Sequence, residues 1–210
     1  MERVPDKVTE AACGEEHTIV LTQKGEVYAF GSNRKGQLGT GQPSKGCALP
    51  TFLEELSFSR MIKVRAGSFS ASLSADGQLY VWGEGTFGQF YTPHRIKSAK
   101  VLDIQDFQIS RMGLAAVVSR SGTCYTWGPN DVGQLGHGDF LPRQTPQRVK
   151  QLEGKRVTQI GLGEDFVIAL GLTLPQQEYA KLAAQNGVLK QKSQSQAAGK
   201  SQKIRRMKPG

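Results

Sequence analysis

The chain has 210 residues, of which 38% are hydrophobic and 25 are glycine, and its formal net charge is +9. This length allows one well-formed core, or one domain followed by a tail. No stretch approaches the roughly 18 apolar residues of a membrane-spanning helix, and the N-terminal residues lack the apolar region of a secretory signal, so we predict neither. Cys13, Cys47 and Cys124 lack metal-ligand spacing, so we expect reduced thiols and no metal site.

One sequence pattern occurs three times, at residues 25–39, 77–90 and 122–136, and each copy begins Gly–x–x–Tyr–x–aromatic–Gly. The copies start 52 and 45 residues apart. A period near this length, built on short β-rich segments, predicts a stack of similar β units. Repeats of this kind usually bind other molecules, so the default function is binding and not catalysis.

Each unit has the same order of predicted elements. In the first unit, residues 8–14 and 17–22 form two strands, residues 23–25 form a tight turn, residues 26–31 form the partner strand of a hairpin, and residues 32–41 form a glycine-rich loop. The predicted units span about 8–60, 61–100 and 101–156, with a partial unit at 157–174. We therefore expect one all-β repeat domain over residues 1–174.

The third strand of each unit places large and small side chains on opposite faces. Because side chains alternate along a strand, Val27 and Ala29 lie on one face while Tyr28 and Phe30 lie on the other. The equivalent aromatic pairs are Tyr28/Phe30, Tyr80/Trp82 and Tyr125/Trp127. This alternation suits sheets that pack face to face, with each ring burying roughly 150–250 Å².

The composition changes after Leu174. Residues 175–191 have apolar spacings of three and four and are predicted to form a short helix. Residues 192–210 are predicted to be a basic flexible tail, in which residues 203–208 resemble a weak localisation signal. Residues 176–210 carry eight lysines and arginines against one acid, Glu178, so most of the positive charge belongs to this segment.

Residues 11–21, AACGEEHTIVL, resemble the signature of the regulator of chromosome condensation repeats. The Gly–Gln–Leu–Gly loops at residues 36–39 and 133–136 are similar to those of the same family, and the resemblance covers residues 8–171. It implies a seven-bladed β-propeller. The second repeat departs from the pattern, because residues 88–91 read Gly–Gln–Phe–Tyr and Ser70 stands near the place of His17.

Three and a fraction repeats are too few to close a seven-bladed ring. We therefore predict an incomplete β-propeller of about three to four four-stranded antiparallel blades, followed by the short helix and the basic tail. An arc of this kind leaves sheet faces and strand edges uncovered. We expect protein partners to cover the open faces, with self-association as the second possibility.

No enzyme active site is predicted. His17 is the most noticeable titratable residue, but the family motif makes it a packed hydrogen-bonding residue, while His94 and His137 are expected in loops. Residues 31–36 resemble a phosphate-binding loop only superficially, because no Lys–Ser or Lys–Thr follows the second glycine. We expect no catalytic residue, no cofactor and no metal.

The function that follows is a non-catalytic protein-interaction scaffold within a larger cytoskeletal, ciliary or chromatin-associated assembly. One alternative, implied by the family, is guanine-nucleotide exchange on a Ran-like small GTPase. Another is binding of chromatin or nucleic acid through the tail, which could also bind a polyanionic surface such as tubulin. The protein is expected in the cytoplasm, the cytoskeleton or a cilium, or alternatively in the nucleus. The residues expected to contact partners are Arg34, Lys35, Arg205 and Arg206.

Overall fold

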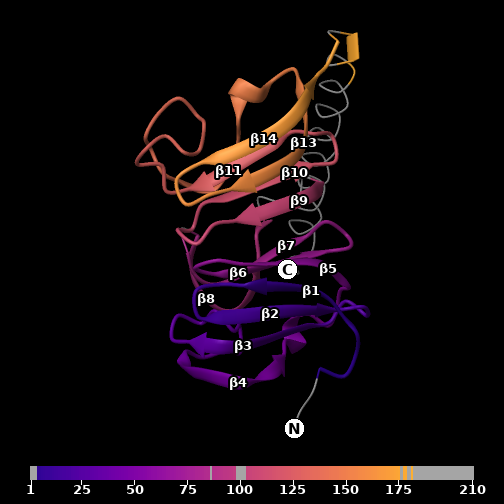
Figure 1. Ribbon diagram of the computed structural model, residues 1–210, viewed down its shortest axis with the longest axis vertical. Coiled ribbons are helices and arrows are strands. Elements are labelled where there is room, and N and C mark those ends of the chain that lie inside the picture. The colour runs from indigo at the N-terminus through magenta and orange to yellow at the C-terminus, as the bar shows by residue number, and fades with distance from the viewer. Residues whose placement is uncertain (1–3, 86, 98–102, 176, 179–180, 182–210) are drawn as a thin grey trace, which may run out of the picture.

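Consecutive strands of this chain form antiparallel meanders, each joined to the next by a short connection. A computed structural model describes residues 4–85, 87–97, 103–175, 177, 178 and 181. The described strands form three four-stranded sheets and one two-stranded sheet. The sheets are stacked in chain order, from β1–β4 at the bottom of Figure 1 to β13 and β14 at the top.

The first two sheets follow the order β1-β2-β3-β4 and β5-β6-β7-β8. The first contains β1 (Val8–Cys13), β2 (His17–Thr22), β3 (Val27–Asn33) and β4 (Ser44–Phe52). The second contains β5 (Met61–Ala66), β6 (Ser70–Ser74), β7 (Leu79–Gly85) and β8 (Gly88–Arg95). A 3-10 turn at Glu54–Leu56 lies between them.

The third sheet repeats this order, and the fourth sheet has two strands. The third contains β9 (Ile104–Ile109), β10 (Ala115–Ser119), β11 (Cys124–Gly128) and β12 (Arg143–Arg148). After a 3-10 turn at Lys150–Leu152, β13 (Lys155–Leu162) pairs with β14 (Val167–Thr173). The predicted partial fourth repeat is therefore half of a four-stranded sheet.

The turn between the second and third strands needs glycine in each complete sheet. Gly25, Gly77 and Gly122 have φ values of +87°, +76° and +80°, a region that residues with a Cβ rarely adopt. In the first sheet, the Gly25 amide donates to the Thr22 carbonyl at 2.9 Å. The tight turn predicted at residues 23–25 is thus confirmed, and its equivalents recur in the next two repeats.

The sheets pack face to face as the aromatic alternation predicted. Between the first and second sheets, Val27 and Ala29 share one buried cluster with Tyr80 and Trp82. Between the second and third sheets, the equivalent cluster includes Trp127. The third-strand aromatics of each sheet therefore pack onto the small side of the preceding sheet.

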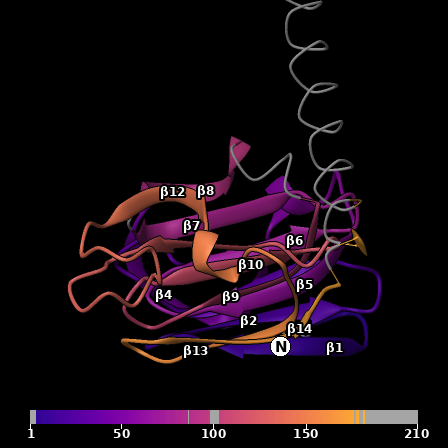
Figure 2. The same ribbon diagram turned by 90° about the horizontal axis from the view of Figure 1, so that it is seen from above.

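The first strands of the sheets lie next to one another. β1 contacts β5, β5 contacts β9, and β9 contacts β13. In the view from above, β1 and β13 lie on one side of the stack, whereas β8 and β12 lie on the opposite side (Figure 2). This is the arrangement of an incomplete propeller whose first strands face the axis. The predicted helix at 175–191 and tail at 192–210 lie almost entirely outside the described residues.

Replacing Trp82 with alanine should remove the largest buried ring between the first and second sheets. Trp82 is fully buried, and the Cβ position of Gly39 lies 2.8 Å from its ring, so the pocket cannot collapse without moving the loop. We expect Trp82→Ala to lower the unfolding free energy by about 3–5 kcal/mol in urea titrations. Leu141→Ala, at an exposed loop position, should change it by less than about 0.5 kcal/mol. Equal effects would contradict this packing scheme.

Candidate interaction surfaces

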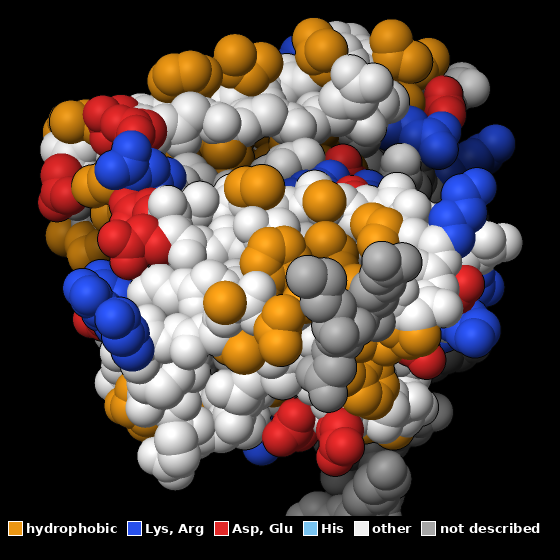
Figure 3. Space-filling model, turned by 60° about the horizontal axis from the view of Figure 1, so that its bottom comes forward, with side chains coloured by type: hydrophobic (Ala, Val, Ile, Leu, Met, Phe, Trp, Pro, Cys, Tyr) orange, Lys and Arg blue, Asp and Glu red, His pale blue; other side chains and the backbone are white. Residues whose placement is uncertain are grey.

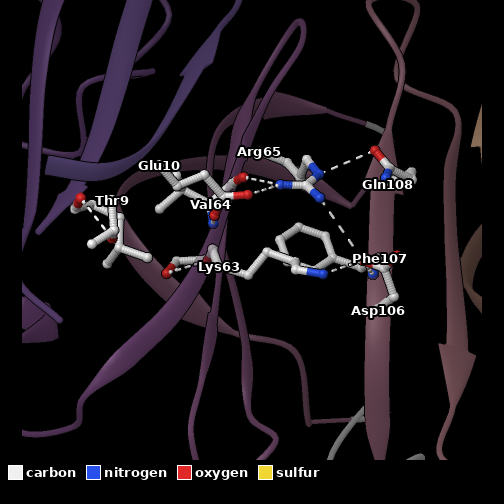
Figure 4. Close-up of polar contacts among 10 residues, drawn as sticks. Thr9, Glu10, Lys63, Val64, Arg65, Asp106, Phe107 and Gln108 are labelled. Carbon is white, nitrogen blue, oxygen red and sulfur yellow. Dashed lines mark hydrogen bonds and ion pairs between the residues drawn. The ribbon is translucent and has the colours of Figure 1, made fainter. Parts of the chain in front are cut away.

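A polar network joins the first strands of the first three sheets (Figure 4). Glu10 on β1 accepts a hydrogen bond from the backbone amide of Val64 at 2.9 Å, and it forms an ion pair with Arg65 Nη1 at 2.6 Å. Arg65 on β5 also donates from Nε to the Gln108 side chain on β9 at 3.1 Å. Its Nη2 lies 3.9 Å from Asp106. One guanidinium therefore connects three blades.

Two further contacts support the same network. Lys63 Nζ donates to Asp106 Oδ1 at 2.8 Å, and the Arg65 guanidinium lies 5.7 Å from the centre of the Phe107 ring. Glu10 on β1, Lys63 on β5 and Asp106 on β9 occupy equivalent repeat positions. The charge at this position is therefore negative, positive and negative in the first, second and third sheets. This position is Gln159 on β13, and the position of Arg65 is Gly161 there. The charge alternation stops at the fourth sheet.

His17 connects the first two sheets by a buried hydrogen bond. Its Nε2 lies 2.8 Å from the hydroxyl of Ser70, and that hydroxyl donates to the Gln37 carbonyl at 2.7 Å. Because the Ser70 proton is committed to the Gln37 carbonyl, His17 donates to Ser70 from Nε2–H. A Cβ at Gly14 would lie within 2.6 Å of the ring, which explains the glycine before it. The packing role predicted for His17 is therefore confirmed.

The register corrects two details of the sequence analysis. Cys13 pairs with Thr18 and Ala66 pairs with Ser70, so Phe69 holds the place of His17 in the second repeat and Ser70 is instead its partner. His94 lies on β8 and not in a loop, with its ring stacked 4.0 Å from that of Phe90.

Two buried asparagines organise the loops that follow the third strands. Asn33 Oδ1 accepts the Leu38 amide at 3.0 Å, and Asn130 Oδ1 accepts the Leu135 amide at 2.9 Å. Their side-chain amides donate to the far side of the same loops. The sequence analysis missed these residues. The signal was present, because asparagine stands three residues before Gly–Gln–Leu–Gly in both loops.

A cleft of about 530 Å³ lies where the first strands of all four sheets end. Arg111 Nε donates to Glu15 at 2.7 Å, and Arg111 Nη1 lies 4.0 Å from Glu164. This hydrogen bond lowers the pKa of Glu15. These side chains are 44–65% exposed, so the ion pairs contribute little stability, and the cleft presents polar groups near the axis.

Of the four residues predicted to contact partners, two lie in the described part of the chain. Arg34 and Lys35 are exposed in the loop after β3. Lys35 Nζ lies 3.6 Å from Glu84 on the next sheet, which leaves Arg34 as the more available of the two. Arg205 and Arg206 lie outside the described residues.

The largest apolar exposure belongs to the outer face of the fourth sheet. Phe166, which precedes β14, and Ile168, Leu170 and Leu172 on β14 are 55–66% exposed. Val167 and Ala169 alternate with them and line a cavity against the third sheet. Ile168 and Leu170 are equivalent to Ile19 and Leu21 of the first sheet, which are buried against the second sheet.

The first sheet has an outward face at the other end of the stack. Ala11, Val20, Tyr28 and Phe52 are paired across its four strands on that face. The Tyr28 and Phe52 rings contact each other at 5.3 Å between centroids. With the bottom of Figure 1 brought forward, hydrophobic side chains gather in the middle of the visible face and charged side chains lie mostly toward its edges (Figure 3). Val20 and Tyr28 are nevertheless buried, with 8% and 9% exposure, so this face presents less apolar surface than the outer face of the fourth sheet.

Within the residues that the structure describes, no group of three or more His, Cys, Asp or Glu side chains could hold a metal ion. Over the same residues, no helix is long and apolar enough to cross a membrane.

Comparison with known families agrees with this geometry. Residues 24–72 and 121–170 match the regulator of chromosome condensation (RCC1) repeat, and residues 8–37 match a second description of the same repeat. The chain belongs to the RCC1 repeat family. The matched segments fall on the first three sheets and on the half sheet that follows, which confirms the resemblance identified from the sequence.

The relatives of this RCC1-repeat chain include proteins of different activities. It is 31% identical over 173 residues to the human E3 ubiquitin-protein ligase HERC2, covering 78% of this chain and 4% of HERC2. It is also 31% identical over 172 residues to the Arabidopsis thaliana ultraviolet-B receptor UVR8, covering 78% of this chain and 39% of UVR8. The chain thus spans well under half the length of these curated relatives.

Solved structures give the same picture of the fold. The crystal structure of human WBSCR16 superposes with a TM-score of 0.72 at 28% identity, over 81% of this chain and 47% of that one. The crystal structure of Prp20p from Saccharomyces cerevisiae superposes with a TM-score of 0.74 at 20% identity, over 85% and 47%. The RCC1-repeat chain therefore corresponds to about half of each of these structures.

Removing Arg65 should loosen three sheets at once. Arg65→Ala leaves Glu10 and Asp106 with fewer partners at partly buried positions, so we expect a loss of about 2 kcal/mol in the urea-unfolding free energy. Arg120→Ala is the matched control, because its ion pair with Asp103 is exposed and should be worth less than about 1 kcal/mol. A loss no larger than that of the control would show that the network does not join the blades.

His17 should make stability depend on pH. Burial lowers the pKa of His17 from 6.5 to about 4, so in the interval between these values the unfolded chain binds the proton and the folded chain does not. The His17 contribution is therefore fully present above pH 6.5 and is lost as the pH falls toward 4. We expect the unfolding free energy to drop by about 2 kcal/mol from pH 7 to pH 5. The drop should shrink in His17→Gln but persist in His94→Gln; an unchanged drop in His17→Gln would refute this assignment.

Proposed function

We propose that this chain is a non-catalytic protein-interaction scaffold and that it works as a subunit of a larger assembly. The observation that carries the proposal is the apolar outer face of the fourth sheet, where four large hydrophobic side chains are more than half exposed. Exposed, contiguous apolar surface on a folded protein marks an interaction site or an aggregation hazard. A protein partner that packs on this face would bury it as each sheet buries the preceding one.

The shared fold supports binding as the general activity of the chain. HERC2 is named a ubiquitin ligase and UVR8 an ultraviolet-B receptor, although each matches 78% of this chain. A single scaffold that appears in proteins of such different activities supplies a binding platform, and the specific function lies in surfaces that differ. The segments at 42–60, 89–97 and 137–150, predicted as loops but containing the fourth strands β4, β8 and β12, are the proposed place of specificity, with Arg34 and Lys35 at one rim.

The two alternatives from the sequence stay predictions. Prp20p is described as binding Gsp1p and histones, but at 20% identity its likeness to this chain concerns the fold. Exchange activity on a Ran-like GTPase would be detected as accelerated nucleotide release at catalytic concentration. Binding of nucleic acid or another polyanion by Arg205, Arg206 and the rest of the tail would disappear when residues 192–210 are deleted. The cytoskeletal, ciliary or nuclear location of the assembly is likewise a proposal.

The proposal predicts site-specific contact at the β14 face. A photoreactive amino acid placed at position 168 should cross-link in cells to one discrete partner or to a second copy of the chain. The same group at position 140, an equally exposed apolar residue in a loop of the third repeat, should not give that product.

Solution mass provides the second readout. If a second copy covers the face, light scattering should show a mass that rises with concentration, and the Ile168→Gln/Leu170→Gln pair should return it to the monomer. A well-folded monomer at high concentration, together with no cross-link specific to position 168, would refute the proposed function.

A further inference from the structure

A second feature of the fourth sheet points to a more specific kind of binding. A cavity of about 440 Å³ lies beside β14, on the side that faces the third sheet. Asp165, Phe166, Val167 and Ala169 form one wall, and the opposite wall comes from β11, the loop around Leu135 and the segment near Val149. Phe166 reaches both the cavity and the outer face, whereas Ile168 and Leu170 do not line the cavity.

The repeats show what such a space holds elsewhere in the molecule. The walls at Cys124, Thr126, Leu135, Val149 and Leu152 occupy the repeat positions of Val27, Ala29, Leu38, Leu53 and Leu56. In the first sheet those five side chains form one buried cluster with Tyr80 and Trp82 of β7. The equivalent wall is present in the third sheet, but the part of the fourth sheet that the structure describes has no third strand to pack on it.

The glycine that receives the tryptophan ring shows the same contrast. A Cβ on Gly39 would lie 2.8 Å from Cδ1 of Trp82, so the ring sits directly on this glycine. Gly136 holds the equivalent place in the third repeat, with φ +71° against +73° for Gly39. The nearest atom to its Cβ position is Val149 Cγ1, at 3.7 Å. The loop around Gly136 thus has the backbone conformation of the loop that holds Trp82, but the space beside Gly136 is occupied by no tryptophan ring of the described residues.

The edge of β14 provides the backbone groups for an added strand. Within the described residues, β14 is hydrogen-bonded to β13 alone. In the complete sheets, Ser70 is paired with Trp82 and Ser72 with Tyr80. The residues of β14 at these two positions are Val167 and Ala169, which are the two that line the cavity. A strand added in the same register would direct its two aromatic side chains into the cavity.

Neither tryptophan of this sequence is available to fill that site. The chain has two tryptophans, Trp82 and Trp127, and both already lie in the third strands of complete sheets. We propose that the β14 edge and its cavity bind an extended segment from outside these 210 residues, with the pattern Tyr–x–Trp–Gly, which completes the fourth sheet as its third strand. This inference rests on the proposed function, and it names the chemistry of one partner segment.

The direct test uses a peptide with the sequence of the chain's own residues 77–83, Gly-Gln-Leu-Tyr-Val-Trp-Gly, labelled with fluorescein. Fluorescence polarisation with the full chain should show saturable binding. The peptide with alanine in place of tryptophan should bind roughly tenfold more weakly or worse, because the ring supplies most of the buried area. A scrambled peptide of the same composition should bind as weakly as the alanine peptide. Absence of saturable binding, or equal binding of the scrambled peptide, would overturn the proposal.

Two protein variants separate the cavity from the outer face. Val167→Arg places a charge in the cavity and should weaken peptide binding roughly tenfold or more. Ile168→Gln changes the neighbouring residue, whose side chain points to the opposite face, and should alter binding by less than about twofold. Thermal unfolding of each variant checks its fold, and the peptide series remains decisive if Val167→Arg does not fold.

Hydrogen exchange distinguishes strand addition from nonspecific adhesion. Bound peptide should slow exchange of the backbone amides of residues 166–173, because the β14 edge gains hydrogen-bond partners. Binding without this protection would overturn the strand geometry. If the peptide does not bind but the cross-link at position 168 persists, the inference fails while the proposed function stands.

Discussion

The structure depends on one repeated contact, in which the aromatic third strand of the second and of the third sheet packs onto the apolar face of the sheet before it. Trp82 against Gly39 and Leu38 is the clearest example. One face of a sheet accepts aromatic rings from the next sheet, and the opposite face carries the rings that pack on the sheet before it. A stack of such sheets therefore leaves one face of each kind uncovered at its ends. This asymmetry explains why the ends of the stack are prominent surfaces of the described part of the molecule.

Polar contacts define how the sheets are arranged around the axis. Hydrophobic packing between two sheets tolerates some sliding, whereas the bonds from Glu10 to both the amide of Val64 and the side chain of Arg65 require one alignment of β1 and β5. The His17–Ser70 bond adds a buried contact between the first two sheets. These contacts stop where Gln159 and Gly161 replace the charged residues on β13, so the fourth sheet is held mainly by apolar packing.

The half sheet therefore combines three properties. Its inner face is packed, its outer face is apolar and exposed, and its edge borders a cavity that matches a tryptophan site used elsewhere in the chain. The first property keeps β14 in place, and the other two make it a surface for association. In a repeat protein, a terminal unit has no neighbour on one side, so the surfaces that would contact that neighbour stay exposed. This links the architecture of the half sheet to the proposed function.

The sequence by itself determined the repeated β units, the hairpin of the second and third strands and the face on which each third-strand aromatic residue lies, because these follow from glycine turns and from alternation along strands. It also identified the family from residues 11–21 and the Gly–Gln–Leu–Gly loops. It did not locate the fourth strands β4, β8 and β12. Only the tertiary structure decided which side chains meet across sheets. The pairing of His17 with Ser70, the bridging by Arg65 and the cavity beside Val167 each depend on residues roughly 15–55 positions apart in the chain. Such contacts are fixed by register and sheet stacking, and local sequence patterns do not specify them.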